Sequence, residues 1–104
     1  MNQGEINAAL VALSDREISR FIYRAGLFRR RGLSERKADY IADRLALRDQ
    51  QSDPRRMCIE CSHLQQRGTC FAAASGAMRG VARRLEPVKL VLQRCPNFSW
   101  QKPT

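Results

Sequence analysis

The chain has 104 residues and 7% aromatic residues, enough for one small domain with a modest hydrophobic core but not for two independent domains. No run approaches the roughly 20 apolar residues that span a bilayer, and an acidic residue stands where a secretory signal would be positive. We therefore expect a cytoplasmic protein without membrane contact, whose net charge of +9 favours nucleic acid or an acidic protein as partner.

Residues 1–13 carry one charge and no helix-start signal, so we expect a flexible arm there. A first helix is predicted from Ser14, because Ser14 and Glu17 have capping-box spacing, to the residues just before Gly32. Its apolar stripe consists of Ile18, Phe21, Ile22, Ala25 and Phe28.

A second helix is predicted after Ser34, a good N-cap residue, and its pattern fades after Arg48. Its apolar stripe consists of Ala38, Ile41, Ala42 and Leu45. Since the connection is short, the two helices should pack as an antiparallel hairpin over residues 14–50. The turn GLS also suits a DNA-binding helix-turn-helix, but both helices are longer than that motif needs.

The arginines of the predicted hairpin are candidates for contact with nucleic acid or with a protein partner. The candidates in the first helix are Arg16, Arg20 and Arg24, which form one ridge, and Arg29, Arg30 and Arg31 at its end. Arg55 and Arg56, just before the first cysteine, complete the set. Two blander interpretations stay open: these side chains only solvate a surface, or Arg55, Arg56 and Arg94 surround the cysteine sulfurs.

All four cysteines lie between residues 54 and 104, at the spacing Cys58-x2-Cys61-x8-Cys70-x24-Cys95. A CxxC turn is a common way to bring two thiolates to one zinc ion, and two further cysteines complete a tetrahedral site. We therefore predict a structural zinc site with Cys58, Cys61, Cys70 and Cys95 as ligands. A weak helix capped by Thr69 is expected over residues 70–85.

Other interpretations of the cysteines are weaker. His63 is a possible substitute ligand, and an iron–sulfur cluster also takes four cysteines. Disulfides conflict with the expected compartment, and a thioredoxin-like CxxC would need a preceding strand. A closed four-cysteine site has no open position for substrate, and the chain has no recognisable set of catalytic residues, so we do not expect an enzyme.

The segments RRMCIECSHL and QRCPNF, with a lone cysteine between them, resemble small or C-terminal four-cysteine segments of proteins from bacterial plasmids, phages and integrating elements. The resemblance covers roughly residues 34–98. It implies a mobile-element origin, a role in replication, mobilisation or regulation, and metal ligation by the same four cysteines.

We predict a small, mainly α protein in which residues 14–104 form one domain. It joins the basic hairpin to an irregular, zinc-stabilised half over residues 54–100, similar to a zinc knuckle or treble clef. The predicted function is that of a nucleic-acid-binding accessory or regulatory protein. Duplex DNA is favoured because few aromatic residues lie in the basic region. The alternative is an adaptor or inhibitor that binds an acidic protein in replication, transcription or defence.

Overall fold

The computed structural model describes residues 14–101, and the predicted arm over residues 1–13 lies outside this range. The chain divides between Gln51 and Ser52 into two compact units, and each is described by itself. The division falls close to the predicted boundary between hairpin and cysteine-rich half, whereas a single domain over residues 14–104 stays a prediction. Within residues 14–101 the structure is mainly helical and contains no strand, only isolated β-bridges.

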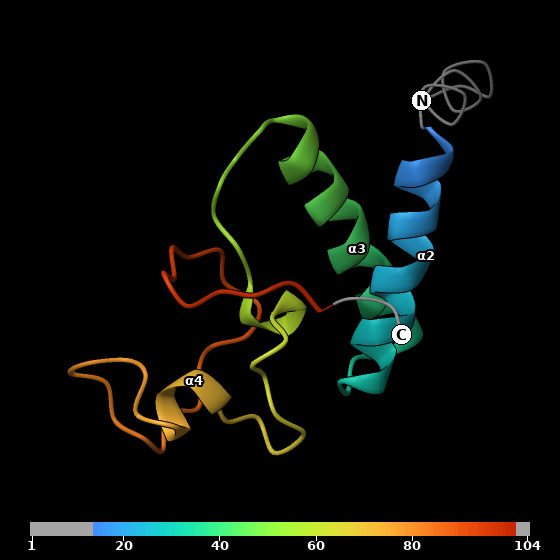
Figure 1. The fold of residues 1–104 in the computed structure, drawn as a ribbon. Helices are drawn as coiled ribbons and strands as arrows, with labels where there is room; N and C mark the ends of the chain where they lie inside the picture. Colours follow the sequence, from blue (N-terminus) through green and yellow to red (C-terminus); the bar gives the residue numbers. More distant parts are fainter. Residues whose placement is uncertain (1–13, 102–104) are drawn as a thin grey trace. The chain divides into compact units, whose positions relative to one another are not determined.

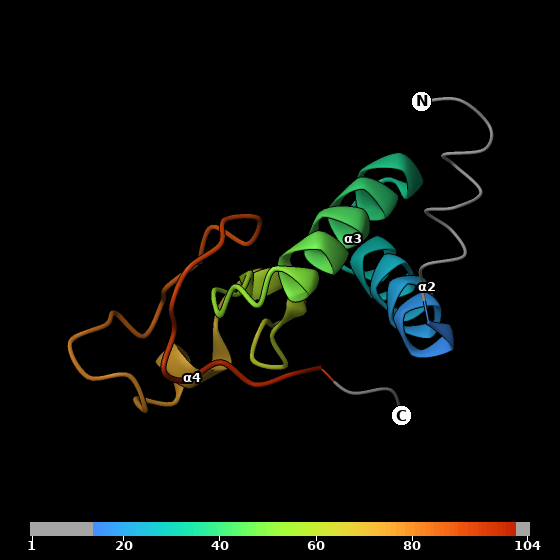
Figure 2. The same cartoon turned by 90° about the horizontal axis from the view of Figure 1, so that it is seen from above.

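The first unit contains helix α2 (Asp15–Arg30) and helix α3 (Glu35–Gln50), which lie next to each other in Figures 1 and 2. The predicted helical hairpin is thus confirmed. No helix within residues 14–101 is both long and apolar enough to cross a membrane.

The predicted N-caps of both helices are confirmed. The hydroxyl of Ser14 accepts a hydrogen bond from the Glu17 N–H at 3.1 Å, and that of Ser34 accepts one from the Lys37 N–H at 3.2 Å. These bonds satisfy N–H groups that have no partner inside a helix. Helix α2 ends before Gly32, whose φ of +101° turns the chain toward α3.

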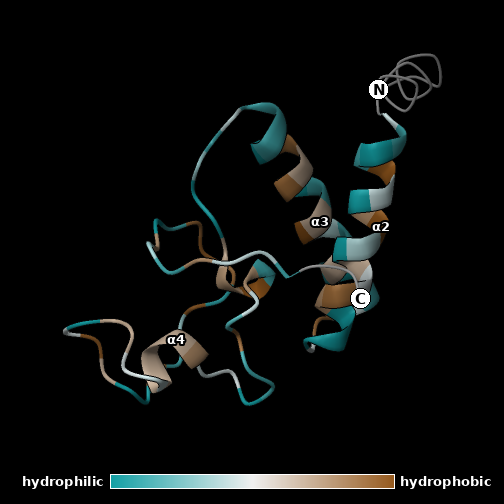
Figure 3. Ribbon diagram, viewed as in Figure 1, coloured by the Kyte–Doolittle hydropathy of each residue, from teal (hydrophilic) through white to brown (hydrophobic). Residues whose placement is uncertain are grey.

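The core of the hairpin uses only part of the predicted stripe on α2. Ala25 and Phe28 are buried, but Ile18 and Ile22 are 41% and 63% exposed. The predicted stripe on α3 is buried throughout, and it consists of Ala38, Ile41, Ala42 and Leu45. Figure 3 shows that α2 and α3 each carry both hydrophobic and hydrophilic residues, as expected for helices with one buried face.

The second unit, residues 52–101, has little regular structure. It contains the 3-10 turn η1 (Cys58–Glu60) and the short helix α4 (Phe71–Ala74). Three isolated antiparallel bridges connect its segments: Arg56 with Gln93, Cys61 with Trp100, and Leu64 with Cys70. Residues distant in sequence are thus joined by single backbone pairs.

The prediction of a helix over residues 70–85 is wrong beyond Ala74. Gly76 and Gly80 have φ values of +82° and +74°, outside the range of a right-handed helix. The Thr69 hydroxyl also does not cap α4, because it donates to Oε1 of Gln65 at 2.7 Å and Cys70 is the N-cap residue.

Candidate metal centre

The CxxC segment forms a tight turn. The backbone N–H of Cys61 donates to the carbonyl of Cys58 at 3.0 Å across η1. The carboxylate of Glu60 accepts a hydrogen bond from the backbone N–H of Met57 at 2.8 Å, and both residues are buried. Glu60 therefore helps to fix the turn from inside, a role that its position in the CxxC segment did not suggest.

Backbone pairing brings the other two cysteines to this turn. The Leu64–Cys70 bridge and a 2.7 Å hydrogen bond from the Phe71 N–H to the His63 carbonyl hold Cys70 beside the segment that follows Cys61. The Arg56–Gln93 bridge, with two backbone hydrogen bonds of 2.8 Å, returns the chain to the segment before Cys58. Cys95 lies two residues further on.

As a result, one pocket in the second unit is lined by all four predicted ligands, Cys58, Cys61, Cys70 and Cys95. His63 and Gln93 also contribute to its wall. All four cysteines are free thiols, and Cys61 is buried while the other three are half-buried. Residues spread between positions 58 and 95 thus line one pocket.

The four thiols are partly or fully buried and lie near one another. Burial, followed by the charges of Cys61, Cys95 and Cys70, raises the pKa of the Cys58 thiol to about 11. Several thiolates in so small a volume repel one another, and a divalent cation removes this repulsion by binding them.

Two N–H groups point at sulfur atoms of the CxxC turn. The side-chain amide of Gln93 donates to Sγ of Cys58 at 3.2 Å, and the backbone N–H of His63 donates to Sγ of Cys61 at 3.4 Å. Hydrogen bonds of this kind stabilise negative charge on sulfur and orient metal ligands. Gln93 could not be recognised from the sequence, because its role depends on pairing with the segment around Arg56.

The shared pocket and the donor arrangement point in different directions. The cysteines have the donor type that zinc and iron–sulfur clusters prefer, and they line one pocket. Yet within residues 14–101 no group of three or more His, Cys, Asp or Glu side chains is arranged to hold a metal ion. The four cysteines therefore share a pocket, but the structure does not arrange them as a metal site. Ligation itself remains a proposal.

His63 was predicted as a possible substitute ligand. Its imidazole ring stacks on the Phe71 ring, with centroids 6.2 Å apart and an interplanar angle of 19°. The residue lines the pocket and donates its backbone N–H to Cys61. His63 therefore lies next to the four cysteines and contacts Cys61 through its backbone.

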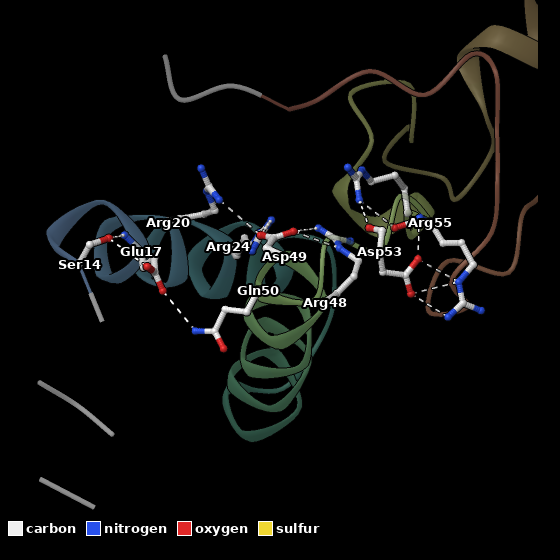
Figure 4. A network of polar contacts seen from close by, with 10 residues as sticks. Ser14, Glu17, Arg20, Arg24, Arg48, Asp49, Gln50, Asp53 and Arg55 are labelled. Atoms are coloured by element: carbon white, nitrogen blue, oxygen red, sulfur yellow. Dashed lines mark hydrogen bonds and ion pairs between the residues drawn. The ribbon is translucent and has the colours of Figure 1, made fainter. Parts of the chain in front are cut away.

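The candidate arginines of the hairpin lie in different environments. Arg24 is buried and pairs with Asp49 of α3 at 2.8 Å, and Arg20 reaches the same carboxylate at 3.4 Å (Figure 4). Arg16, Arg29 and Arg30 are exposed, and Arg31 is half-buried. The predicted ridge is therefore not one continuous row of exposed charges, because Arg24 is buried and pairs with Asp49 of the other helix.

The two candidate arginines of the second unit have partners within that unit. Arg55 forms an ion pair with Asp53 at 2.8 Å. The guanidinium of Arg56 lies 4.8 Å from the centre of the Trp100 ring and donates to the carbonyls of Asp53 and Arg55 at 3.0 Å. No hydrogen bond from either guanidinium to a cysteine is among these contacts.

Further exposed arginines lie in the second unit and were not among the predicted binding residues. They are Arg67, Arg79, Arg83, Arg84 and Arg94. The basic run RGVARRL, residues 79–85, is the signal in the sequence that could have identified three of them.

The chain was compared with protein-family models, curated proteins and solved structures, and no significant match was found in any of the three.

Proposed function

We propose that the protein is a metal-stabilised, nucleic-acid-binding accessory or regulatory protein without enzymatic activity. Its second unit binds one structural zinc ion through Cys58, Cys61, Cys70 and Cys95, and both units contact the phosphate backbone of duplex DNA. In this proposal the protein acts in the cytoplasm of a bacterium. A mobile element encodes it, as the resemblance implies.

The observation that carries this function is the excess of exposed positive charge. Twelve of the sixteen arginines are exposed, against five of the nine acidic residues within residues 14–101. In the second unit the only exposed acidic residue of the described range is Glu86, against six exposed arginines. Guanidinium groups bind phosphate oxygens in a bidentate manner, so this distribution suits a polyanion.

The metal has a structural role in this proposal. The four thiolates would complete its coordination, so no position stays open for a substrate. Metal affinity then contributes to folding free energy, because the unfolded chain holds no such site.

Salt dependence of binding to a short duplex tests the function. Each phosphate contact releases a counterion, so affinity should fall steeply, by about 10³-fold or more for six contacts, between 50 and 200 mM salt. Fluorescence anisotropy with a labelled duplex measures this. An affinity that barely changes over that range would contradict the proposal.

Matched variants test whether the exposed arginines are responsible. Replacing Arg79, Arg83 and Arg84 with Gln should weaken duplex binding and lower the salt slope. Replacing Glu86 with Gln, in the same segment, should leave binding unchanged or slightly tighter. Equal affinities of the triple variant and the wild type would exclude this segment from the interface.

The second candidate function is an adaptor that binds an acidic protein, and exposed apolar side chains favour it. In the second unit Phe71, Val88, Val91 and Trp100 are 53%, 68%, 52% and 43% exposed. Trp100 packs edge-to-face on half-buried Phe98, with ring centroids 4.9 Å apart. Aromatic anchors of this kind are common at protein interfaces. Capture from a nuclease-treated lysate separates the two functions, because only an adaptor retains a stoichiometric protein partner.

A further inference from the structure

The helical hairpin contains a groove of about 270 Å³ between the first half of α2 and the last turn of α3. Three arginines line it, Arg16, Arg20 and Arg24, and its two carboxylates belong to Glu17 and Asp49. The groove lies within the first unit and shares no residue with the cysteine pocket.

Both carboxylates of the groove already accept hydrogen bonds. Oδ1 of Asp49 accepts from Nε and Nη2 of Arg48 at 3.1 and 2.7 Å, and its Oδ2 lies 2.8 Å from Nη2 of Arg24. Oε2 of Glu17 accepts from the side-chain amide of Gln50 at 3.3 Å. Figure 4 shows these contacts. The three arginines and two carboxylates that line the groove give it a net charge of +1.

Arg20 is the arginine best placed to receive an added anion. One of its nitrogens, Nη1, lies 3.4 Å from Oδ2 of Asp49, which is a long contact, and the side chain is 47% exposed. Arg16 is exposed and precedes Arg20 by one helical turn, so the two cations are neighbours on the helix surface. Like charges at this spacing repel each other, and a bound anion would relieve that repulsion.

We propose that this groove is a binding site for a single phosphate group, with Arg16 and Arg20 as its direct contacts. The inference deepens the proposed function and rests on it for the source of the phosphate, the backbone of a nucleic acid. A small phosphorylated molecule presents the same chemistry and is the other source. The groove is larger than one phosphate group, so it also accommodates the ester that the phosphate carries.

Titration of the full chain with inorganic phosphate at constant ionic strength tests the groove. The Nε–H NMR signals of Arg16 and Arg20 should shift saturably, whereas chloride should give no saturable shift. The double variant R16Q/R20Q should lose about tenfold or more in phosphate affinity, because it removes two charge-assisted contacts. Arg36→Gln is the matched control, since Arg36 is exposed on α3 and outside the groove, and it should bind as the wild type does.

The inference is overturned if phosphate and chloride cause equal shifts, or if R16Q/R20Q binds phosphate as the wild type does while its circular dichroism shows an intact hairpin. Duplex binding, measured on the same samples, separates this failure from failure of the proposed function. Salt-dependent duplex binding combined with unchanged phosphate affinity of R16Q/R20Q rejects the groove alone. Saturable phosphate binding at Arg16 and Arg20 without duplex binding supports the groove, rejects the nucleic-acid function and identifies the source as a small phosphorylated molecule.

Discussion

Asp49 connects the two helices of the hairpin through charge. Burial alone would raise the pKa of its carboxyl group, but hydrogen bonds from Arg48 and Arg24 and their positive charges outweigh burial and hold this pKa below its usual value. The ionised carboxylate is therefore the form that the folded hairpin favours. A residue with a lowered pKa in the folded state stabilises that state above the pKa of the unfolded chain, and this contribution is lost as pH falls.

Replacing Asp49 with Asn should lower the free energy of unfolding by about 1–3 kcal/mol at pH 7, because Arg24 and Arg48 are buried and lose a charged acceptor. The difference between variant and wild type should shrink as pH falls below about 4, where the carboxylate of the unfolded chain takes up a proton while that of the folded chain, whose pKa is lowered, stays ionised to lower pH. Urea denaturation at several pH values measures this. The control is Asp39→Asn on the exposed face of α3, which should be nearly neutral. A loss of the same size at pH 3 and pH 7 would show that the charge of Asp49 is not the cause.

At the scale of elements, the two long helices could be predicted because their signals are local. A cap residue at Ser14 or Ser34, a periodic apolar pattern and a glycine at the first helix end together specify a helix without reference to the rest of the chain. The pairing of Arg24 with Asp49 could not be predicted in the same way. It depends on how α2 faces α3, and the 3.6-residue period fixes that rotation only approximately.

In the second unit the candidate ligands could be predicted from the sequence, but the local path of the chain could not. The identity and spacing of the cysteines predicted four metal ligands, and these residues line one pocket, but within residues 14–101 they form no metal-binding group. The path of the chain between them was not predictable, because single bridges and positive φ values at Gly68, Gly76 and Gly80 determine it. In the structure Nη2 of Arg83 lies only 2.8 Å from the position that a Cβ at Gly76 would take. Such a contact leaves no periodic trace in a sequence.

The N-caps allow a prediction at this scale. Ser34→Ala should destabilise the hairpin by about 1 kcal/mol, because the Lys37 N–H loses its acceptor, whereas Ser34→Gly should cost only a few tenths of that. Ser19→Ala, at an exposed position inside α2, is the control and should be neutral or slightly stabilising. Thermal denaturation followed at 222 nm gives the comparison. If Ser34→Ala and Ser19→Ala behaved alike, capping by Ser34 would contribute nothing measurable.

At the scale of the whole molecule, the two units should respond differently to loss of metal. The hairpin consists of two long helices with buried residues such as Phe28 and Leu45, whereas the second unit buries Ile59 but has little regular structure and joins its segments through single bridges around the cysteine pocket. A metal that binds the four thiolates would therefore contribute much of the folding free energy of residues 52–101.

When a strong chelator removes the metal, the second unit should unfold before the hairpin does. Trp100, the only tryptophan, pairs with Cys61 in a β-bridge and carries Arg56 on its ring, so its fluorescence should change when the cysteines are released. Amide hydrogen exchange should accelerate in residues 56–101 before it does in α2 and α3. Unchanged fluorescence and exchange after complete metal removal would mean that the metal does not hold this unit together.

The most direct test of this account is the metal content of the purified protein, measured by elemental analysis together with a count of reactive thiols. We expect about one zinc ion per chain, thiols protected from alkylation until a chelator is added, loss of the metal on Cys58→Ser, and its retention on His63→Ala. If the analysis found iron and inorganic sulfide in place of zinc, the same four cysteines would hold an iron–sulfur cluster. A folded protein that contains no metal, with its four cysteines either reactive or joined in disulfides, would contradict the proposed metal centre.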